Sequence, residues 1–147
     1  DVYKRQENVR LADNLFLKVQ AFTEQGDQLM QAENFTQAIK EYQKAWSLLP
    51  EPKQLWDVST WIKVAQAEAL LMLKDYAAAR EKLMQGIICK DAVHNPLVHL
   101  LLGIANYETG DMDSAKKELQ LAYDLEGESI FADEDDKYLQ LLKESID

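Results

Sequence analysis

Apolar and small residues recur at steps of four or three near the start of the chain. This spacing keeps one face of an α-helix apolar and predicts an amphipathic helix from about residue 7 to about residue 32. Residues 1–6 do not join the pattern, and we expect them to fray. The positions of the stripe are Leu11, Leu15, Val19, Phe22, Gly26 and Leu29.

A second pattern begins at the polar turn residue Asn34 and returns twice. A small residue stands four positions after the turn, a large one eight after it and a second small one eleven after it. Small residues at this spacing lie on one helix face, two turns apart, so a second helix can approach closely. The three sets are Ala38, Tyr42 and Ala45; Ala79, Leu83 and Gly86; and Ala115, Leu119 and Ala122.

An apolar helix precedes each of these turns, so each copy of the pattern predicts a helical hairpin. One hairpin cannot cover its own apolar face, and the copies must therefore stack on one another. The alternative is an ordinary helical bundle in which the spacing arises by chance. Three matches, each at a helix–turn–helix junction, disfavour that alternative, and no segment has the pattern of a strand.

Prolines and capping residues bound the middle helices. Pro50 and Pro52 end the second helix, and Ser59 or Thr60 can cap a third. We expect the third helix to reach about residue 74 and the fourth about residue 90. The fifth begins at Asn95, with asparagine as the cap and proline at the first helical position.

Glycines end the last two helices of the repeated pattern, the fifth at Gly110 and the sixth, from about residue 112 to 125, at Gly127. A seventh helix is expected from about residue 133 to 145, with charges around one apolar edge. A stack of repeats needs such a polar-backed cap at its end. The apolar edge consists of Tyr138, Leu139, Leu142 and Ile146.

The hairpins resemble tetratricopeptide repeats, on residues at the signature positions of that family. The first copy carries Gly26, Leu29, Phe35, Ala38, Tyr42, Ala45 and Pro50. The second keeps Ala67, Leu70, Tyr76, Ala79 and Leu83, with Gly86 at the second small position. The third carries Leu102, Gly103, Gly110, Asp111, Ala115, Leu119 and Ala122. The resemblance covers roughly residues 19 to 129.

The spacing between copies departs from the family. Ala38 and Ala79 are 41 residues apart and Ala79 and Ala115 are 36 apart, whereas the usual period is about 34. The extra residues, at 51–59 and around 92–95, fall between repeats and leave the stack intact. The resemblance implies an all-α solenoid of about three hairpins, at about 19–52, 60–93 and 96–129, in a single domain. A longer N-terminal helix precedes them and a capping helix at about 133–146 follows.

Charge and composition narrow the classes of partner. The 147 residues fit one domain, and 47% of them are hydrophobic. A net charge of −10 argues against binding to nucleic acid or to an anionic membrane, and favours either a basic partner or simple solubility. The single cysteine, Cys89, cannot form an internal disulfide. No apolar run approaches a membrane span and no signal-peptide core is present, so we expect a cytoplasmic location.

No pattern of catalytic or metal-binding residues emerges, so we expect no enzyme activity, cofactor or metal. No serine, cysteine or lysine has a recognisable activating neighbour, and no glycine-rich phosphate loop occurs. His94 and His99 are five residues apart and do not share a helix face. The acidic run 133–136 lacks the glycine and distal glutamate of a calcium loop, and an acidic first helical turn explains it better.

In tetratricopeptide repeats the first helix of each hairpin lines a concave groove that binds partners. Carried over by position, the partner-binding residues expected here are Asp27, Met30, Trp61, Val64, Glu68, Leu71, Leu100, Ile104, Tyr107 and Glu108. Trp61, Leu100, Ile104 and Tyr107 would be apolar anchors, and Asp27, Glu68 and Glu108 a charged rim. The alternative is that Leu97 and Leu100 only pack against the capping helix.

The ligand expected from these positions differs from the best-known ligand of the family. That ligand is a C-terminal carboxylate, clamped by lysine, asparagine and arginine, and none of these stands at the corresponding positions. The residues there are Thr23, Asp27, Val64, Leu100 and Leu101. A groove that is apolar and acidic suits an apolar or basic-amphipathic segment.

The function expected is therefore a non-enzymatic module that binds a peptide or helix of another protein, as a chaperone or adaptor. Two alternatives remain open on fold-level analogy. The chain could be an immunity-type protein that neutralises a toxin, or a structural piece of a larger assembly that self-associates through Trp56, Trp61 or its end helices. We expect a monomer or a weak dimer.

Overall fold

The computed structural model describes the backbone of residues 2–144 and the side chains of residues 13–144. Within these bounds the chain forms α-helices and short 3-10 helices and no strand, so the expected all-α class is confirmed. The α-helices are α1 (Val2–Gln31), α2 (Phe35–Leu48), α3 (Ser59–Met72), α4 (Tyr76–Gly86), α5 (Pro96–Glu108), α6 (Met112–Glu126) and α7 (Asp136–Glu144). The 3-10 helices are η1 (Lys53–Leu55), η2 (Ala92–His94) and η3 (Glu128–Phe131).

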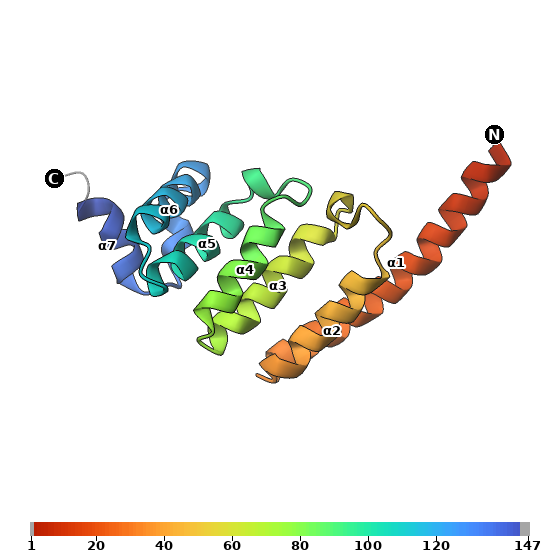
Figure 1. The fold of residues 1–147 in the computed structure, drawn as a ribbon, viewed down its shortest axis with the longest axis horizontal. Helices are drawn as coiled ribbons and strands as arrows, with labels where there is room; N and C mark the ends of the chain where they lie inside the picture. Colours follow the sequence, from red (N-terminus) through yellow and green to blue (C-terminus); the bar gives the residue numbers. More distant parts are fainter. Residues whose placement is uncertain (1, 145–147) are drawn as a thin grey trace.

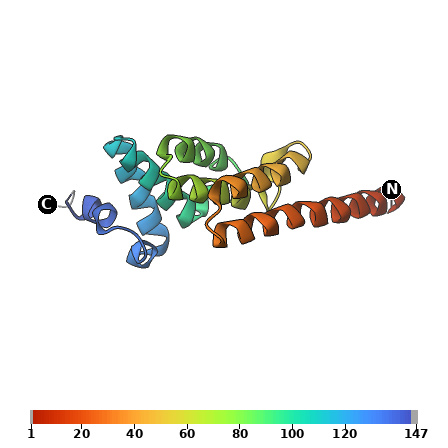
Figure 2. The same ribbon diagram turned by 90° about the horizontal axis from the view of Figure 1, so that it is seen from below.

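Helical hairpins follow one another along the long axis of the molecule. The pairs α1–α2, α3–α4 and α5–α6 pack antiparallel and stack in chain order, and α7 lies at the end of the stack away from the N-terminus (Figure 1). Both views show α1 extending well past the end of α2 (Figures 1 and 2). This is the expected α-solenoid with a long N-terminal helix. None of the described helices is long and apolar enough to cross a membrane.

The three hairpin turns share one backbone conformation. Just past the end of each first helix one residue has positive φ, with Glu33 at 60°, Lys74 at 61° and Gly110 at 91°. The next residue donates its N–H to a carbonyl five positions back, from Asn34 to Leu29 at 2.8 Å and equivalently in the other two turns. This pattern satisfies the last carbonyls of each first helix. The repeat seen in the sequence is therefore also a repeat of the backbone structure, as the spacing predicts.

The small residues of the pattern are the points where helices meet. All the alanines of the three sets are fully buried, and the large residue of each set lies buried between them. The first and third hairpins close most tightly where a glycine of the first helix faces the large residue of the second. A Cβ on Gly26 would lie 2.5 Å from the Tyr42 ring, and one on Gly103 would lie 2.5 Å from Leu119 Cδ2. The two helices of each of these hairpins therefore lie too close together at these positions for any side chain larger than that of glycine.

Several expected helix ends differ from the structure. Helix α1 begins at Val2 and not near residue 7, so the expectation that residues 2–6 fray is wrong; no proline or glycine interrupts the helix there. Helix α4 ends at Gly86 and not near residue 90, because the Lys90 N–H bonds outside it to Gln54 O at 2.8 Å. Helix α7 begins at Asp136 and not at 133, after an Asp135 side chain that accepts from Lys137 N. Residues 145–146 lie outside the described residues.

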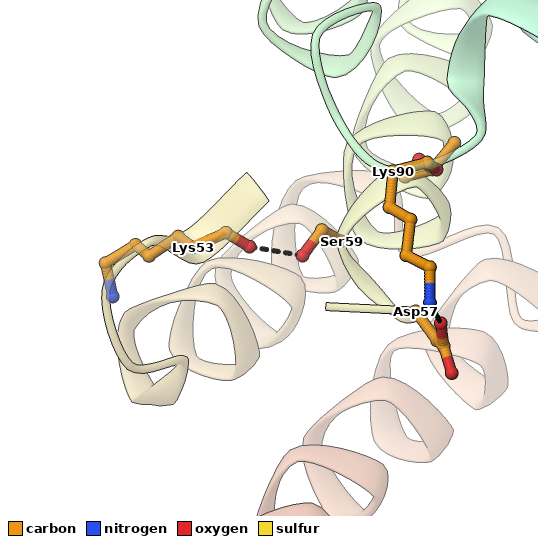
Figure 3. Close-up of polar contacts among 5 residues, drawn as sticks. Lys53, Asp57, Ser59 and Lys90 are labelled. Carbon is orange, nitrogen blue, oxygen red and sulfur yellow. Dashed lines mark hydrogen bonds and ion pairs between the residues drawn. The ribbon is translucent and has the colours of Figure 1, made fainter. Parts of the chain in front are cut away.

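The first insertion is bonded to the segment that leads from α4 into the second insertion. Ser59 Oγ donates to Lys53 O, and Lys90 forms an ion pair with Asp57, so residues 53–59 are tied to the segment after α4 (Figure 3). Thr60 Oγ1 donates to Lys90 O at 2.7 Å. The expectation that Ser59 or Thr60 caps α3 is therefore wrong: Val58 occupies the cap position, and both hydroxyls bond to the connecting segments.

A histidine ties the second insertion to the third hairpin. His99 is buried in α5, with Nε2 2.7 Å from Val93 O and Nδ1 2.6 Å from Glu118 Oε2 of α6. Both ring nitrogens are thus used within the fold. Among the described residues, no group of three or more His, Cys, Asp or Glu could hold a metal ion.

Replacing Asn95 with alanine is expected to destabilise the protein by about 1 kcal/mol. The Asn95 side chain accepts from Leu97 N at 2.9 Å and so satisfies a free N–H at the start of α5, as the Asn-Pro signal predicts. Asn34 is a matched control, since it occupies the cap position of α2 without a side-chain cap bond. Urea titration measures both variants. An equal loss for Asn34→Ala and Asn95→Ala would contradict the cap assignment.

Candidate functional site

Two adjoining hollows form a groove along the first helices of the hairpins. The larger has a volume of about 600 Å³ and lies between the end of α1, α3, α5 and α7; its apolar lining includes Met30, Leu71, Leu97, Leu101, Ile104 and Tyr138. The smaller, of about 310 Å³, is lined by Asp27, Met30, Tyr42, Trp61, Val64, Ala65 and Glu68. Because Met30 and Glu68 line both hollows, we treat them as one groove.

Seven of the ten positions carried over from the family line this groove. Asp27, Met30, Trp61, Val64 and Glu68 belong to the smaller hollow, and Met30, Glu68, Leu71 and Ile104 to the larger. Their accessibility differs. Trp61 is 56% exposed, whereas Val64 and Ile104 present only a small part of their surface. Among these seven positions, the apolar surface available to a partner is therefore concentrated on Trp61, Met30 and Leu71, and Met72 adds exposed apolar surface to the larger hollow.

The other three positions are used inside the fold. Leu100 is 2% exposed and belongs to a core with residues of α3 to α7, so almost none of its surface is available to a partner as the expected anchor would need. Tyr107 packs edge-on against Tyr138 of α7, with ring centroids 5.2 Å apart. Glu108 Oε1 accepts from Tyr138 Oη at 2.7 Å and pairs with Lys137 Nζ at 2.6 Å. Helix α7 thus covers the Tyr107 and Glu108 side of α5.

The α7 contacts also set the charge at that end. Burial alone would raise the pKa of the Glu108 carboxyl, but the bonds from Lys137 and Tyr138 outweigh burial and hold this pKa below its usual value. Lys137 Nζ additionally lies 5.4 Å from the centre of the Tyr107 ring. Glu108 is therefore ionised and already neutralised by a cation of its own chain.

The groove itself is acidic and has no such cation. Carboxylates of Asp27, Glu33, Glu68 and Glu134 line it, and no Lys, Arg or His does so among the described residues. Asp27 Oδ1 accepts from Tyr42 Oη at 2.6 Å. Burial, and then the charges of Glu134 and Asp27, raise the pKa of Glu68. Burial, and then Asp133, raise the pKa of Glu134. The groove therefore holds partly desolvated negative charge.

Sequence reasoning missed the residues that close the groove from outside the first helices. Phe35 and Tyr76 enter from the starts of α2 and α4, and Glu134 and Tyr138 from the segment at α7. The family positions used for the prediction lie only on the first helix of each hairpin. The apolar edge of the capping helix, which contains Tyr138, was the signal that pointed toward this wall.

Replacing Glu68 with glutamine is expected to raise the melting temperature near neutral pH. Because folding raises the pKa of Glu68, the folded state binds more protons than the unfolded state in the window above the usual value of 4.5. Stability then falls as pH rises through that window, so the ionised Glu68 side chain carries a cost that is absent at low pH. The gain from Glu68→Gln should shrink as the pH is lowered toward 4.5.

Glu81 of α4 provides the matched control, because it is exposed and lines neither hollow. Thermal melts of Glu68→Gln and Glu81→Gln at both pH values make the comparison. A Glu68→Gln variant that melts earlier than the parent near neutral pH would contradict the assignment of unneutralised charge to the groove.

Comparison with known proteins finds solved structures of the same fold. No protein-family model and no curated protein matches the chain. The first TPR domain of Spaghetti (RPAP3), solved with the HSP90 peptide SRMEEVD, superposes with a TM-score of 0.72 at 17% identity, over 89% of this chain and 95% of that one. The C-terminal TPR-containing domain of a Plasmodium falciparum putative FK506-binding protein gives 0.67 at 19% identity, over 91% and 89%. The chain thus has the tetratricopeptide-repeat fold that its spacing predicts.

Proposed function

We propose that this protein is a non-enzymatic interaction module that holds a peptide or helix of another protein in the groove, as a chaperone or adaptor. The observation that carries the proposal is an open groove whose lining combines apolar side chains with carboxylates and no basic side chain among the described residues. Exposed aromatic and aliphatic groups such as Trp61 supply binding energy when a partner covers them. A cytoplasmic location remains a prediction.

The charge of the groove indicates which peptides it accepts. The peptide bound to the RPAP3 domain, SRMEEVD, has three acidic residues and one basic residue. Such a peptide would place negative charge against Glu68 and Glu134, whose pKa values are already raised. Like charges in a partly desolvated site repel strongly. The segment proposed for this groove is therefore apolar or basic and amphipathic, and SRMEEVD should not bind.

A displayed library of random peptides tests the proposal, because it presents acidic, basic and apolar segments to the groove side by side. The library is selected on the wild-type protein and on Trp61→Glu, which places a charge on the exposed anchor of the groove. Met84→Glu is the matched control, because Met84 is 50% exposed on α4 and lines neither hollow. The proposal expects peptides that bind wild type and Met84→Glu alike and lose binding to Trp61→Glu.

Two results would overturn the proposal. One is that no peptide is enriched above a selection on uncoated support. The other is that enriched peptides bind Trp61→Glu as well as wild type, since the groove would then not be the binding surface. Light scattering over a range of concentrations tests the structural alternative, because self-association through Trp61 should disappear in Trp61→Glu.

A further inference from the structure

We propose that the partner segment carries a lysine or arginine that docks beside Glu68, and that this one charge selects the partner among apolar segments. The inference rests on the proposed function and specifies its ligand chemistry. Glu68 lies on α3 and lines both hollows, so a segment that follows the groove must pass it. A cation at that point would have apolar contacts on either side, from Trp61 in one hollow and Leu71 in the other.

The charged groups around Glu68 would attract a cation to this part of the groove and repel an anion. The charged groups that interact with it are both acidic: Asp27 on α1 and Glu134 on the segment before α7. No described residue forms an ion pair with Glu68, whereas the partly buried carboxylates of Glu41 and Glu108 each pair with a lysine. A partly buried carboxylate without a counter-ion is costly, and a cation from a partner would relieve that cost.

Helix α7 shows how this protein already holds a helix by the same chemistry. Lys137 of α7 pairs with Glu108 at 2.6 Å and lies 5.3 Å from the ring centre of Tyr138 and 5.4 Å from that of Tyr107. Leu142 and Tyr138 of α7 bury apolar surface beside this pair. The end of α5, beside the groove, thus holds one amphipathic helix, because the Glu108 carboxylate and the Tyr107 ring receive its lysine.

The part of the groove around Glu68 offers two of these components, a carboxylate and an aromatic ring, and lacks the cation. Glu68 supplies the carboxylate, and the exposed ring of Trp61 supplies the aromatic surface in the same hollow, where Tyr42 is buried. A lysine or arginine side chain can form a charged hydrogen bond with a carboxylate and a cation–π contact with an aromatic face. A metal ion is a poorer occupant, because no group of three or more potential ligands comes together among the described residues.

The test uses peptides selected from the displayed library on wild type near neutral pH, at physiological ionic strength so that long-range attraction is screened. The strongest peptide is synthesised, and its affinity is measured for wild type, Glu68→Lys and Glu81→Lys. The two variants have the same net charge, but Glu81 is exposed on α4 outside the groove. A second peptide replaces its basic residue next to the apolar residues with glutamate.

The inference expects a basic residue beside apolar ones in the selected peptides. Glu68→Lys should weaken the first peptide by about tenfold or more, because a close charge pair is replaced by repulsion. Glu81→Lys should stay within about twofold, as is usual for a surface change away from the site. The glutamate peptide should bind Glu68→Lys better than it binds wild type, since the charge pair is restored with exchanged signs.

The failures of the two proposals are distinguishable. If no peptide is enriched, the proposed function fails and this inference with it. If peptides bind in the groove but lack basic residues, or if Glu68→Lys leaves their affinity unchanged, only the inference fails. Equal losses in Glu68→Lys and Glu81→Lys would likewise overturn it, because the attraction would then come from overall charge. Glu68→Gln adds an independent readout: it should bind the basic peptide more weakly while melting later than the parent.

Discussion

Replacing Gly103 with valine is expected to lower the free energy of unfolding by about 3 kcal/mol. A Cβ at position 103 would lie 2.5 Å from Leu119 Cδ2 and 3.1 Å from the Leu119 backbone nitrogen. Leu119 of α6 is fully buried in the core, so its side chain cannot move out of the way without disturbing neighbouring packing. The clash must therefore separate the third hairpin, which carries one wall of the groove. In a chain of this size the melting temperature should fall by about 10 °C.

Gly86→Ala is the control for this prediction. A Cβ at position 86 would come no closer than 3.1 Å to any neighbouring atom, and that atom is the Lys63 Cβ. Alanine also has a higher helix propensity than glycine by about 1 kcal/mol, which offsets a slight contact. Thermal melts should therefore show little change for Gly86→Ala and a large loss for Gly103→Val. A Gly103→Val variant that melts with the parent would show that α5 and α6 do not approach as closely as described.

Replacing Trp61 with alanine is expected to weaken binding of a groove peptide by about 2 kcal/mol, roughly 30-fold in Kd, mostly through a faster off-rate. Trp61 is the most exposed large apolar side chain of the groove lining after Met72, and it stands next to Glu68 in the smaller hollow. Because more than half of its surface faces solvent in the free protein, its removal should leave the melting temperature nearly unchanged.

Met84→Ala is the control, as an exposed apolar residue of α4 outside both hollows. Surface plasmon resonance with a library-selected peptide gives both rates for Trp61→Ala, Met84→Ala and the parent. Unchanged peptide affinity in Trp61→Ala, or an equal loss in Met84→Ala, would rule out Trp61 as an anchor. An early melt would instead place Trp61 among the residues that hold the fold.

The helical hairpins could be predicted because residue types at fixed spacings mark helix contacts and helix ends. Small residues such as Ala79 and Gly103 mark close helix contacts, and Asn95 and Gly110 mark a start and a stop. The helix-end errors arose where tertiary bonds compete with these rules. Thr60 is a good capping residue by type, yet its hydroxyl bonds to the carbonyl of Lys90, which is distant in the chain. Such a partner becomes visible only when the first insertion and the segment after α4 are placed side by side.

The groove was predicted in part, for a related reason. Positions that depend only on the repeat, such as Trp61, Glu68 and Leu71, line it. Tyr107 and Glu108 occupy equivalent positions of the repeat, but α7 packs on them. The position of a terminal helix is set by its own contacts and not by the repeat spacing. The same packing brings Glu134 to the groove.

The central claim is that a segment of another protein binds between α1, α3 and α5. Backbone NMR chemical-shift mapping with a library-selected basic peptide tests it most directly, because each residue reports separately. The account predicts that the large shifts cluster at Met30, Trp61, Glu68 and Leu71, which line the two hollows. Exposed residues of α4, such as Glu81 and Met84, should stay unshifted. Shifts confined to α2, α4 and α6, or to the bonded segments around Lys53 and Lys90, would contradict the account.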